Sequence, residues 1–360
     1  MSRPSTVRTV PPWPPELPDP RDVDPGQGRR AEPLEILGLV LLGANVWWVY
    51  AAGALAGGTP GPAALLILAC AAAYVLARLG GSSFPRLVPG ALVAVAAGIA
   101  LLTPDLLSNA ALSGPFGYAN AKGAFFAQAA IAALFLALTS KAPLARLLGT
   151  ASAAGFAVIP FAAGSVASAI LLIALAPIAL AAGTPRATRP VVFGFAALFV
   201  VVLATTVVLG ARHSIGGPSG PLGRVANSTL SERRLVLWHD ALTLLRLNLG
   251  VGVGPGRFGQ LSPTAQRDPD ARWAHNEFLQ HGAETGVVGL ALLGLVFLWG
   301  FARLFAAVGR MAVLGAAALA VLGIHASVDY VMHFPMVPIY AAALVGAGST
   351  SHRRRLRSTR

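Results

Sequence analysis

Long stretches of this chain are apolar on every helical face. A soluble helix keeps one polar side and a half-buried strand alternates, whereas a helix that crosses a bilayer needs about 20 mostly apolar residues. Runs of this kind predict ten membrane-spanning helices. They cover residues 35–54, 62–79, 87–103, 122–139, 144–161, 165–183, 190–210, 284–302, 311–326 and 333–347. The expected fold is therefore an all-α polytopic membrane protein with about ten transmembrane helices.

Composition agrees with this pattern, because 55% of the residues are apolar and only 11% are charged. Soluble domains carry about 25% charged residues. The single cysteine, Cys70, lies inside an apolar run, so no internal disulfide is expected. The abundance of Ala, Gly and Arg is typical of a high-GC bacterial genome.

The charged residues predict the topology. If the N-terminus is cytoplasmic, every short cytoplasmic connection carries cations, as the positive-inside rule requires. These cations are Arg78, Arg86, Lys141, Arg146, Arg186, Arg189, Arg303 and Arg310. The short external connections hold only Lys122, and all eight acidic residues after Glu35 fall outside. Both termini are therefore expected in the cytoplasm, with the chain in the cytoplasmic (inner) membrane.

The formal net charge of +13 is explained in the same way. The basic tail that ends at Arg360 could bind DNA, but beside a membrane exit it is better interpreted as a topology anchor that attracts anionic lipid headgroups. Membrane lipids are thus expected partners, and nucleic acid is not.

These patterns divide the chain into five parts. Residues 1–33 are Pro-rich without apolar periodicity, which predicts a disordered cytoplasmic tail rather than a signal peptide. Residues 34–210 hold helices one to seven, 211–283 form a large extracytoplasmic loop, 284–347 hold the last three helices, and 348–360 form a basic cytoplasmic tail.

The large loop is too long for a simple connector, so we expect it to be structured, with short surface helices. Ser231 can cap a helix that runs to about Asn248, and its apolar residues recur at helical spacing. Such an amphipathic helix is suited to the membrane surface. Arg233 and Arg234 in its first turn either hold a phosphate or contact lipid headgroups.

Two other loop features point to weaker possibilities. Gly254 to Gly259 matches G-x-G-x-x-G, but Pro255 interrupts it and no βαβ unit surrounds it, so a dinucleotide site is rejected. Its backbone amides could still approach a phosphate. His275 and His281 lie six residues apart, on different helix faces, and no H-E-x-x-H is present, so no metal site is expected. His275 is either an interfacial residue or a catalytic one.

Several outward segments together resemble the O-antigen ligase and polymerase family. The resemblance rests on residues 234–238, the Gly-rich stretch ending in Phe258, residues 274–279 and 284–286, the earlier stretch 114–120, and the turn 325–335. It implies a metal-independent, inverting glycosyltransferase of the bacterial cell envelope that needs no cofactor. Its donor would be a glycan on polyprenyl (usually undecaprenyl) pyrophosphate, and its acceptor a hydroxyl on a glycan, lipid or protein. By position, Arg234 and His275 match the residues that the family needs for activity.

The chemistry of these side chains agrees with that assignment. A permanent guanidinium charge suits a pyrophosphate leaving group, and an imidazole near its ordinary pKa of about 6.5 suits the proton of the incoming hydroxyl. We therefore assign catalysis to Arg234 and His275, which are expected within about 15 Å of each other. Asn276 and Glu284 are expected to position them.

Further substrate contacts are expected from polar residues near these segments. They are Arg233, Arg257, Arg272, Arg212, Arg224, Asn120, Lys122, His325 and Asp329. Asp329 is either a second base or the partner of an external Arg, and Lys122 either touches the donor or snorkels.

Three other functions compete with the ligase. A polymerase of the same family uses the same residues. A transporter or flippase of lipid-linked oligosaccharide would need polar residues near the bilayer midplane and internal repeats, neither of which is evident. A non-catalytic assembly subunit would not need Arg234, His275 and Asn276.

Overall fold

The computed structural model describes residues 33–84, 86–103, 106–107, 116–181, 185–213, 232–268, 271–307 and 309–350, and within these ranges every regular element is helical. The helices before the large loop are α1 (Pro33–Ala56), α2 (Pro60–Ser83), α3 (Leu87–Leu102), α4 (Ala119–Thr139), α5 (Pro143–Ala162), α6 (Val166–Ala181) and α7 (Pro185–His213). After it come α9 (Glu232–Leu247), α10 (Phe258–Leu261), α11 (Pro263–Arg267), α12 (Glu277–Ala306), α13 (Arg310–Ala326), the 3-10 turn η2 (Val331–His333) and α14 (Met336–Gly348).

Each of the ten predicted spans coincides with one of these helices. Six helices are long and apolar enough to cross a membrane, namely α1, α2, α4, α5, α7 and α12. The apolar helices α3, α13 and α14 are shorter, with 16, 17 and 13 residues. The chain is therefore an all-helical multi-pass membrane protein.

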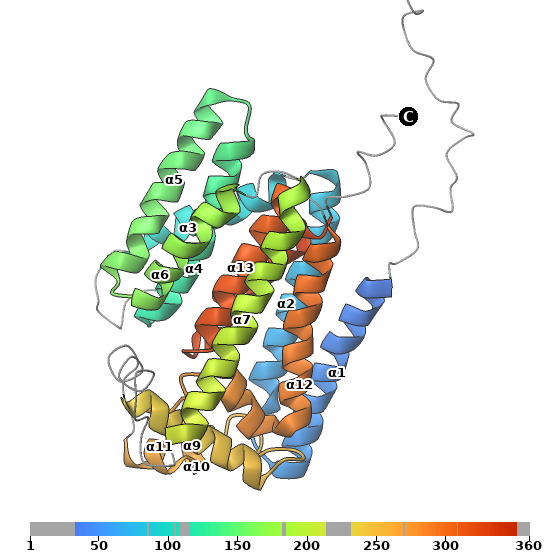
Figure 1. Cartoon of the computed structure of the whole chain (residues 1–360), viewed down its shortest axis with the longest axis vertical. Coiled ribbons are helices and arrows are strands. Elements are labelled where there is room, and N and C mark those ends of the chain that lie inside the picture. Colours follow the sequence, from blue (N-terminus) through green and yellow to red (C-terminus); the bar gives the residue numbers. More distant parts are fainter. Residues whose placement is uncertain are drawn as a thin grey trace, which may run out of the picture.

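The Ala-rich helix α4 is the most buried of the six long apolar helices. It packs against α3, α5, α6 and α13, while α1 packs against α2 and α12, and α2 against α14 (Figure 1). Small residues permit these close approaches, as is common between helices in membranes. At Gly346 of α14, for example, a Cβ would lie 2.2 Å from the Tyr74 carbonyl oxygen of α2.

Basic residues gather at one end of the bundle. Glu35 at the start of α1 pairs with Arg78 and Arg303, and Arg78 also donates to the carbonyl of Ser349 after α14, at 3.0 Å. The beginning of α1, the ends of α2 and α12 and the residues after α14 thus lie together. This grouping agrees with the alternation that the charge pattern predicts.

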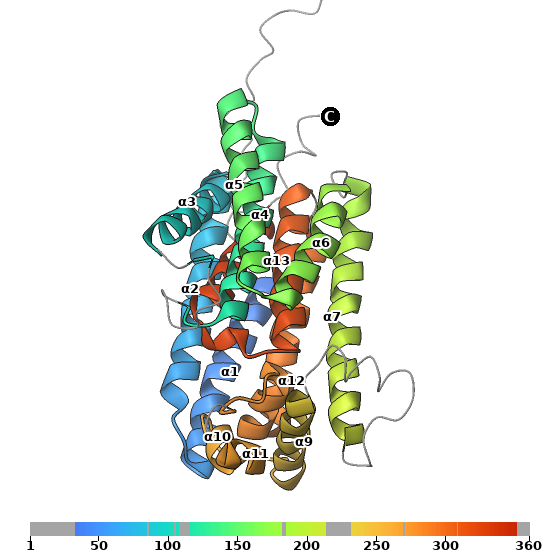
Figure 2. The ribbon, with the colours of Figure 1, turned by 90° about the vertical axis from the view of Figure 1, so that its left-hand side faces the viewer.

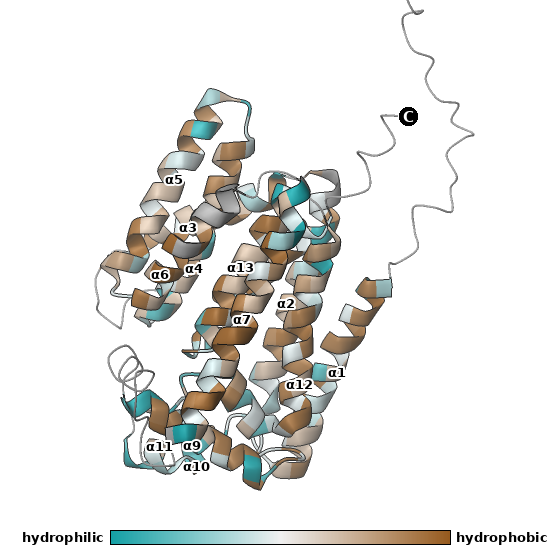
Figure 3. Cartoon of the chain, in the orientation of Figure 1, coloured by the Kyte–Doolittle hydropathy of each residue, from teal (hydrophilic) through white to brown (hydrophobic). Residues whose placement is uncertain are grey.

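The helices of the large loop, α9, α10 and α11, lie at the opposite end (Figures 1 and 2). Hydrophilic residues are prominent on them, whereas the long helices are mostly apolar (Figure 3). The predicted cap of α9, Ser231, lies outside the described residues.

The apolar side of α9 packs against protein, so the prediction of a helix resting on lipid is corrected. Leu235 and Trp238 are fully buried and pack with Leu209 of α7 and Ala283 of α12. The spacing of apolar residues predicts the buried face of a helix, but a protein surface and a lipid surface accept the same face.

Candidate active site

Asp329, in the turn between α13 and α14, makes side-chain hydrogen bonds with four residues from three separate segments. Tyr118, just before α4, donates its hydroxyl to both carboxylate oxygens at 3.0 and 2.8 Å, and Asn120 in the first turn of α4 donates its amide. Arg234 in the first turn of α9 donates at 3.2 Å. His275, just before α12, contributes Nδ1 at 3.0 Å. We call these five residues the Asp329 cluster.

The cluster combines a buried carboxylate with a partly exposed guanidinium and a partly exposed imidazole. The Asp329 side chain is 1% exposed, whereas those of Arg234 and His275 are 23% and 19% exposed. Burial alone would raise the pKa of Asp329. The hydrogen bond from His275 and the charge of Arg234 outweigh burial and hold this pKa well below its usual range. Asp329 is therefore an ionised acceptor rather than a base.

This charge decides the orientation of His275. Because an ionised carboxylate can only accept, the proton that joins His275 to Asp329 resides on Nδ1. In the neutral imidazole, the other ring nitrogen, Nε2, then carries the lone pair. The arrangement resembles the base and carboxylate of acyl-transfer triads, in which the carboxylate sets the tautomer and orientation of the imidazole.

The backbone of His275 is held in an unusual conformation. Its φ is 52°, the one non-glycine in the described residues with a positive φ. Such strain persists only where neighbouring groups enforce it. Here the Trp238 indole donates to the His275 carbonyl at 3.0 Å, and the Ala274 amide donates to the Gln280 side chain at 2.9 Å.

Three consecutive residues at the start of α12 fasten the turn that carries Asp329. His275 binds Asp329, Asn276 donates to the Ser327 carbonyl at 2.6 Å, and Glu277 accepts from the amide of Met332 at 2.9 Å. Asn276 also caps α12 by accepting from the Leu279 amide. Asn276 is fully buried, so its contacts position the site without reaching substrate.

A second pair of a histidine and a carboxylate, which the sequence did not single out, lies beside the cluster. His333 Nδ1 lies 2.9 Å from Glu277, and the His333 ring contacts the Trp273 ring in a tilted arrangement with 4.0 Å between centroids. The Tyr330 ring is near both histidines, with its centroid 4.7 Å from that of His275 and 6.1 Å from that of His333. Glu277 and His333 both lie in the stretches that resemble the family, but their sequence positions, 56 residues apart, do not predict that they pair.

The tyrosines beside Asp329 remain neutral phenols. Burial, together with the nearby Asp329 charge, raises the pKa of Tyr330 to about 12, and the same causes raise the pKa of Tyr118 further. The two rings stack at 4.6 Å between centroids. Aromatic rings beside a few polar groups are typical of ligand sites.

Replacement of His333 by Gln is expected to change the pH dependence of stability. Burial lowers the pKa of His333. The negative charge of Glu277 and its hydrogen bond with His333 outweigh burial, so the pKa of His333 lies above its ordinary value of about 6.5. The pair therefore stabilises fully below about pH 6.5 and loses this contribution as the pH rises through the raised pKa. Melting of wild type and His333→Gln in detergent across this range measures the effect. A difference in melting temperature that stays constant with pH would contradict it.

Glu284 and the Gly-rich stretch form a separate network. The Glu284 carboxylate accepts from the amides of Gly256 at 2.9 Å and Phe258 at 3.2 Å. An internal carboxylate thus occupies the amides that we expected to approach a phosphate. Arg257 donates to the Ala56 carbonyl at 2.6 Å, which ties this stretch to the connection between α1 and α2. Glu284 also accepts from the Gln280 side chain at 3.3 Å, and Gln280 in turn accepts from the Ala274 amide next to His275. Glu284 thus holds the Gly-rich stretch directly and reaches the segment of His275 only through Gln280.

The remaining predicted contacts are dispersed. Arg233 pairs with Asp268, Arg272 and Arg212 are exposed, and Arg224 lies outside the described residues. Lys122 is buried in the first turn of α4. His325 is buried at the end of α13, with Nδ1 3.2 Å from the hydroxyl of Ser168. The fold therefore joins Asn120, Arg234, His275 and Asp329 by hydrogen bonds, and it places His325 near enough to interact electrostatically with Asp329 and Arg234.

Comparison with known proteins supports the resemblance found in the sequence. Residues 151–294 match the family model described as O-antigen ligase. The match contains Arg234 and His275, whereas Tyr118, Asn120 and Asp329 lie outside it. A search of curated proteins found no match.

Proposed function

We propose that the chain acts as a member of the O-antigen ligase and polymerase family, whose model matches residues 151–294, and that it moves a glycan from polyprenyl pyrophosphate to an acceptor hydroxyl. The reaction takes place at the extracytoplasmic face of the bacterial cytoplasmic membrane, during synthesis of a surface polysaccharide such as lipopolysaccharide or exopolysaccharide. One observation carries the proposal, which is that Asp329 holds His275 and Arg234 side by side.

In this reaction His275 acts on the acceptor. Its free Nε2 takes the proton of the acceptor hydroxyl as the oxygen forms a bond to the anomeric carbon of the glycan. The bond between that carbon and the pyrophosphate oxygen breaks, and its electron pair leaves with the polyprenyl pyrophosphate. A single displacement from the opposite face inverts the configuration at the anomeric carbon.

Arg234 acts on the leaving group. One of its N–H groups is used by Asp329, and a guanidinium has five, so others remain for the pyrophosphate oxygens. A cation fixed by a buried carboxylate needs no reorganisation when charge develops on the leaving group. The residue is thus both a member of the cluster and the pyrophosphate contact.

Transfer assays with single variants test these roles. His275→Ala is expected to lower transfer by about 10²- to 10⁴-fold, because the general base is lost, and Arg234→Ala by about 10²- to 10³-fold. The assay uses a purified polyprenyl-pyrophosphate glycan and matched membranes. Arg246→Ala is the control, because Arg246 is an exposed residue in the last turn of the same helix.

The same assay addresses the metal and the product. Metal independence is part of the proposal, so EDTA should leave transfer unchanged. A product extended by one donor glycan indicates a ligase, and a ladder of products indicates a polymerase. If no donor is consumed, or if both variants act like wild type, the proposal is wrong and transport of the lipid-linked glycan becomes the better explanation.

A further inference from the structure

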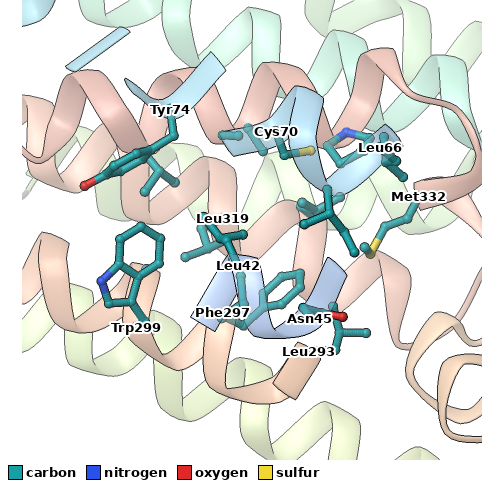
Figure 4. A pocket seen from close by; sticks show the side chains of 18 residues that line it. Leu42, Asn45, Leu66, Cys70, Tyr74, Leu293, Phe297, Trp299, Leu319 and Met332 are labelled. Atoms are coloured by element: carbon teal, nitrogen blue, oxygen red, sulfur yellow. The ribbon is translucent and has the colours of Figure 1, made fainter. Parts of the chain in front are cut away.

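An apolar cavity of about 130 Å³ lies between α1, α2, α12, α13 and α14. Met332 of the turn η2 lines one end, and Tyr74 and Trp299 line the other (Figure 4). Leu66 and Cys70 of α2 lie along its wall. The proposed transfer reaction does not use any of these side chains.

The cavity offers little to a polar ligand. The Tyr74 hydroxyl contacts Ser349 and the Trp299 indole donates to the Leu34 carbonyl at 2.6 Å, so both polar groups are engaged outside it. Asn45 and Cys70 are the polar exceptions on a lining of aliphatic and aromatic side chains. An apolar cavity of about 150 Å³ stays dry and binds benzene, so this one can hold a branched unit of five carbons.

The cavity comes nearest to the turn of the Asp329 cluster at Met332. The side chain of Met332 lines the cavity, while its amide is held by Glu277, next to His275. Met332 is three residues from Asp329 in the same turn. The opposite end lies deeper in the bundle, since Tyr74 contacts Ser349 at the end that gathers the basic residues.

We propose that this cavity binds the isoprene unit next to the pyrophosphate of the lipid donor. In a polyprenyl pyrophosphate the hydrocarbon begins one oxygen away from the phosphate that Arg234 would hold. In a glycolipid acceptor, by contrast, sugars separate the reacting hydroxyl from the hydrocarbon. A hydrocarbon site adjacent to the cluster therefore fits the donor rather than the acceptor.

The inference rests on the proposed function, but binding tests it without transfer. The probe is a geranylgeranyl pyrophosphate with a diazirine on its first isoprene unit, added to the purified full chain in detergent. It carries no glycan and cannot be turned over. We expect photo-crosslinks in the stretches 66–74 and 293–300, competed by unlabelled geranylgeranyl pyrophosphate.

Two adjacent leucines of α2 provide a matched pair of variants. Leu66 lines the cavity, whereas Leu65 is 67% exposed on the outside of the helix. Leu66→Trp should fill the cavity and weaken crosslinking by at least about tenfold, because an isoprene unit loses its buried surface. Leu65→Trp should crosslink like wild type, and equal melting temperatures of the two variants exclude misfolding as the cause.

Three results would overturn the inference. Crosslinks confined to other helices would place the isoprenoid elsewhere, and equal crosslinking of the two variants would show that the cavity is not used. A diazirine phospholipid that labels the same stretches as strongly would show an ordinary lipid site. If the probe binds as expected but no donor glycan is transferred, the cavity assignment stands and the proposed transferase fails.

Discussion

Asp329→Asn is expected to reduce glycan transfer by roughly 10²- to 10⁴-fold, as large an effect as the loss of His275 itself. An amide has nearly the same shape as the carboxylate, but it carries no charge and can donate. It would no longer select the His275 tautomer with the proton on Nδ1. It would also remove the anion that holds Arg234.

The measurement compares initial transfer rates at equal amounts of folded protein. Asp240→Asn is the matched control, since Asp240 is another buried aspartate at this end of the bundle. Its carboxylate accepts from Ser262 at 2.6 Å and from the Thr264 amide at 3.0 Å, so it holds α11 against α9. Asp240→Asn should cost stability with little loss of transfer. Near-normal transfer by Asp329→Asn would refute the central role of the cluster.

Gly286→Ala is expected to lower stability by at least about 2 kcal/mol, through strain and a backbone clash. Gly286 interrupts α12 with φ 73°, a conformation that suits glycine. A Cβ there would lie 2.2 Å from the Gly250 carbonyl oxygen. Thermal unfolding of the purified chain in detergent measures the loss.

The cause of this effect is the way in which the Gly-rich stretch joins α12. At the break, the Val287 amide donates to the Leu249 carbonyl instead of to a carbonyl in the preceding turn of α12. The carbonyls of Ala283 and Glu284 thereby become free to accept from Val253 and Gly254, each at 2.9 Å. A closed helix at Gly286 would compete for these bonds.

Gly294→Ala is the control for this prediction. Gly294 lies two turns further along α12, and a Cβ there meets nothing within 4 Å. Alanine is favoured over glycine inside a helix by up to about 1 kcal/mol, so this variant should keep or raise the melting temperature. Equal melting temperatures for the two variants would contradict the inferred role of the break.

The sequence by itself determined the class of the protein and the positions of its long helices. A bilayer core provides no hydrogen-bond partners, so each crossing must be a local run of about 20 apolar residues with its backbone bonds satisfied within the helix. Because each such run is contiguous in the sequence, it can be recognised without knowledge of the tertiary structure. For the same reason the spacing of Leu235, Trp238 and Leu242 located α9, and the resemblance over the outward segments identified Arg234 and His275.

Only the tertiary structure decided how the polar residues pair. Asp329 meets His275 across 54 positions, Arg234 across 95 and Tyr118 across 211. Glu284 and Asn276 are residue types that are common in active sites. In the structure Glu284 binds the Gly-rich stretch, and Asn276 binds the turn that carries Asp329. A carboxylate or amide has the same local signature in either role, because its function depends on which distant groups the packing of the helices brings within hydrogen-bond distance.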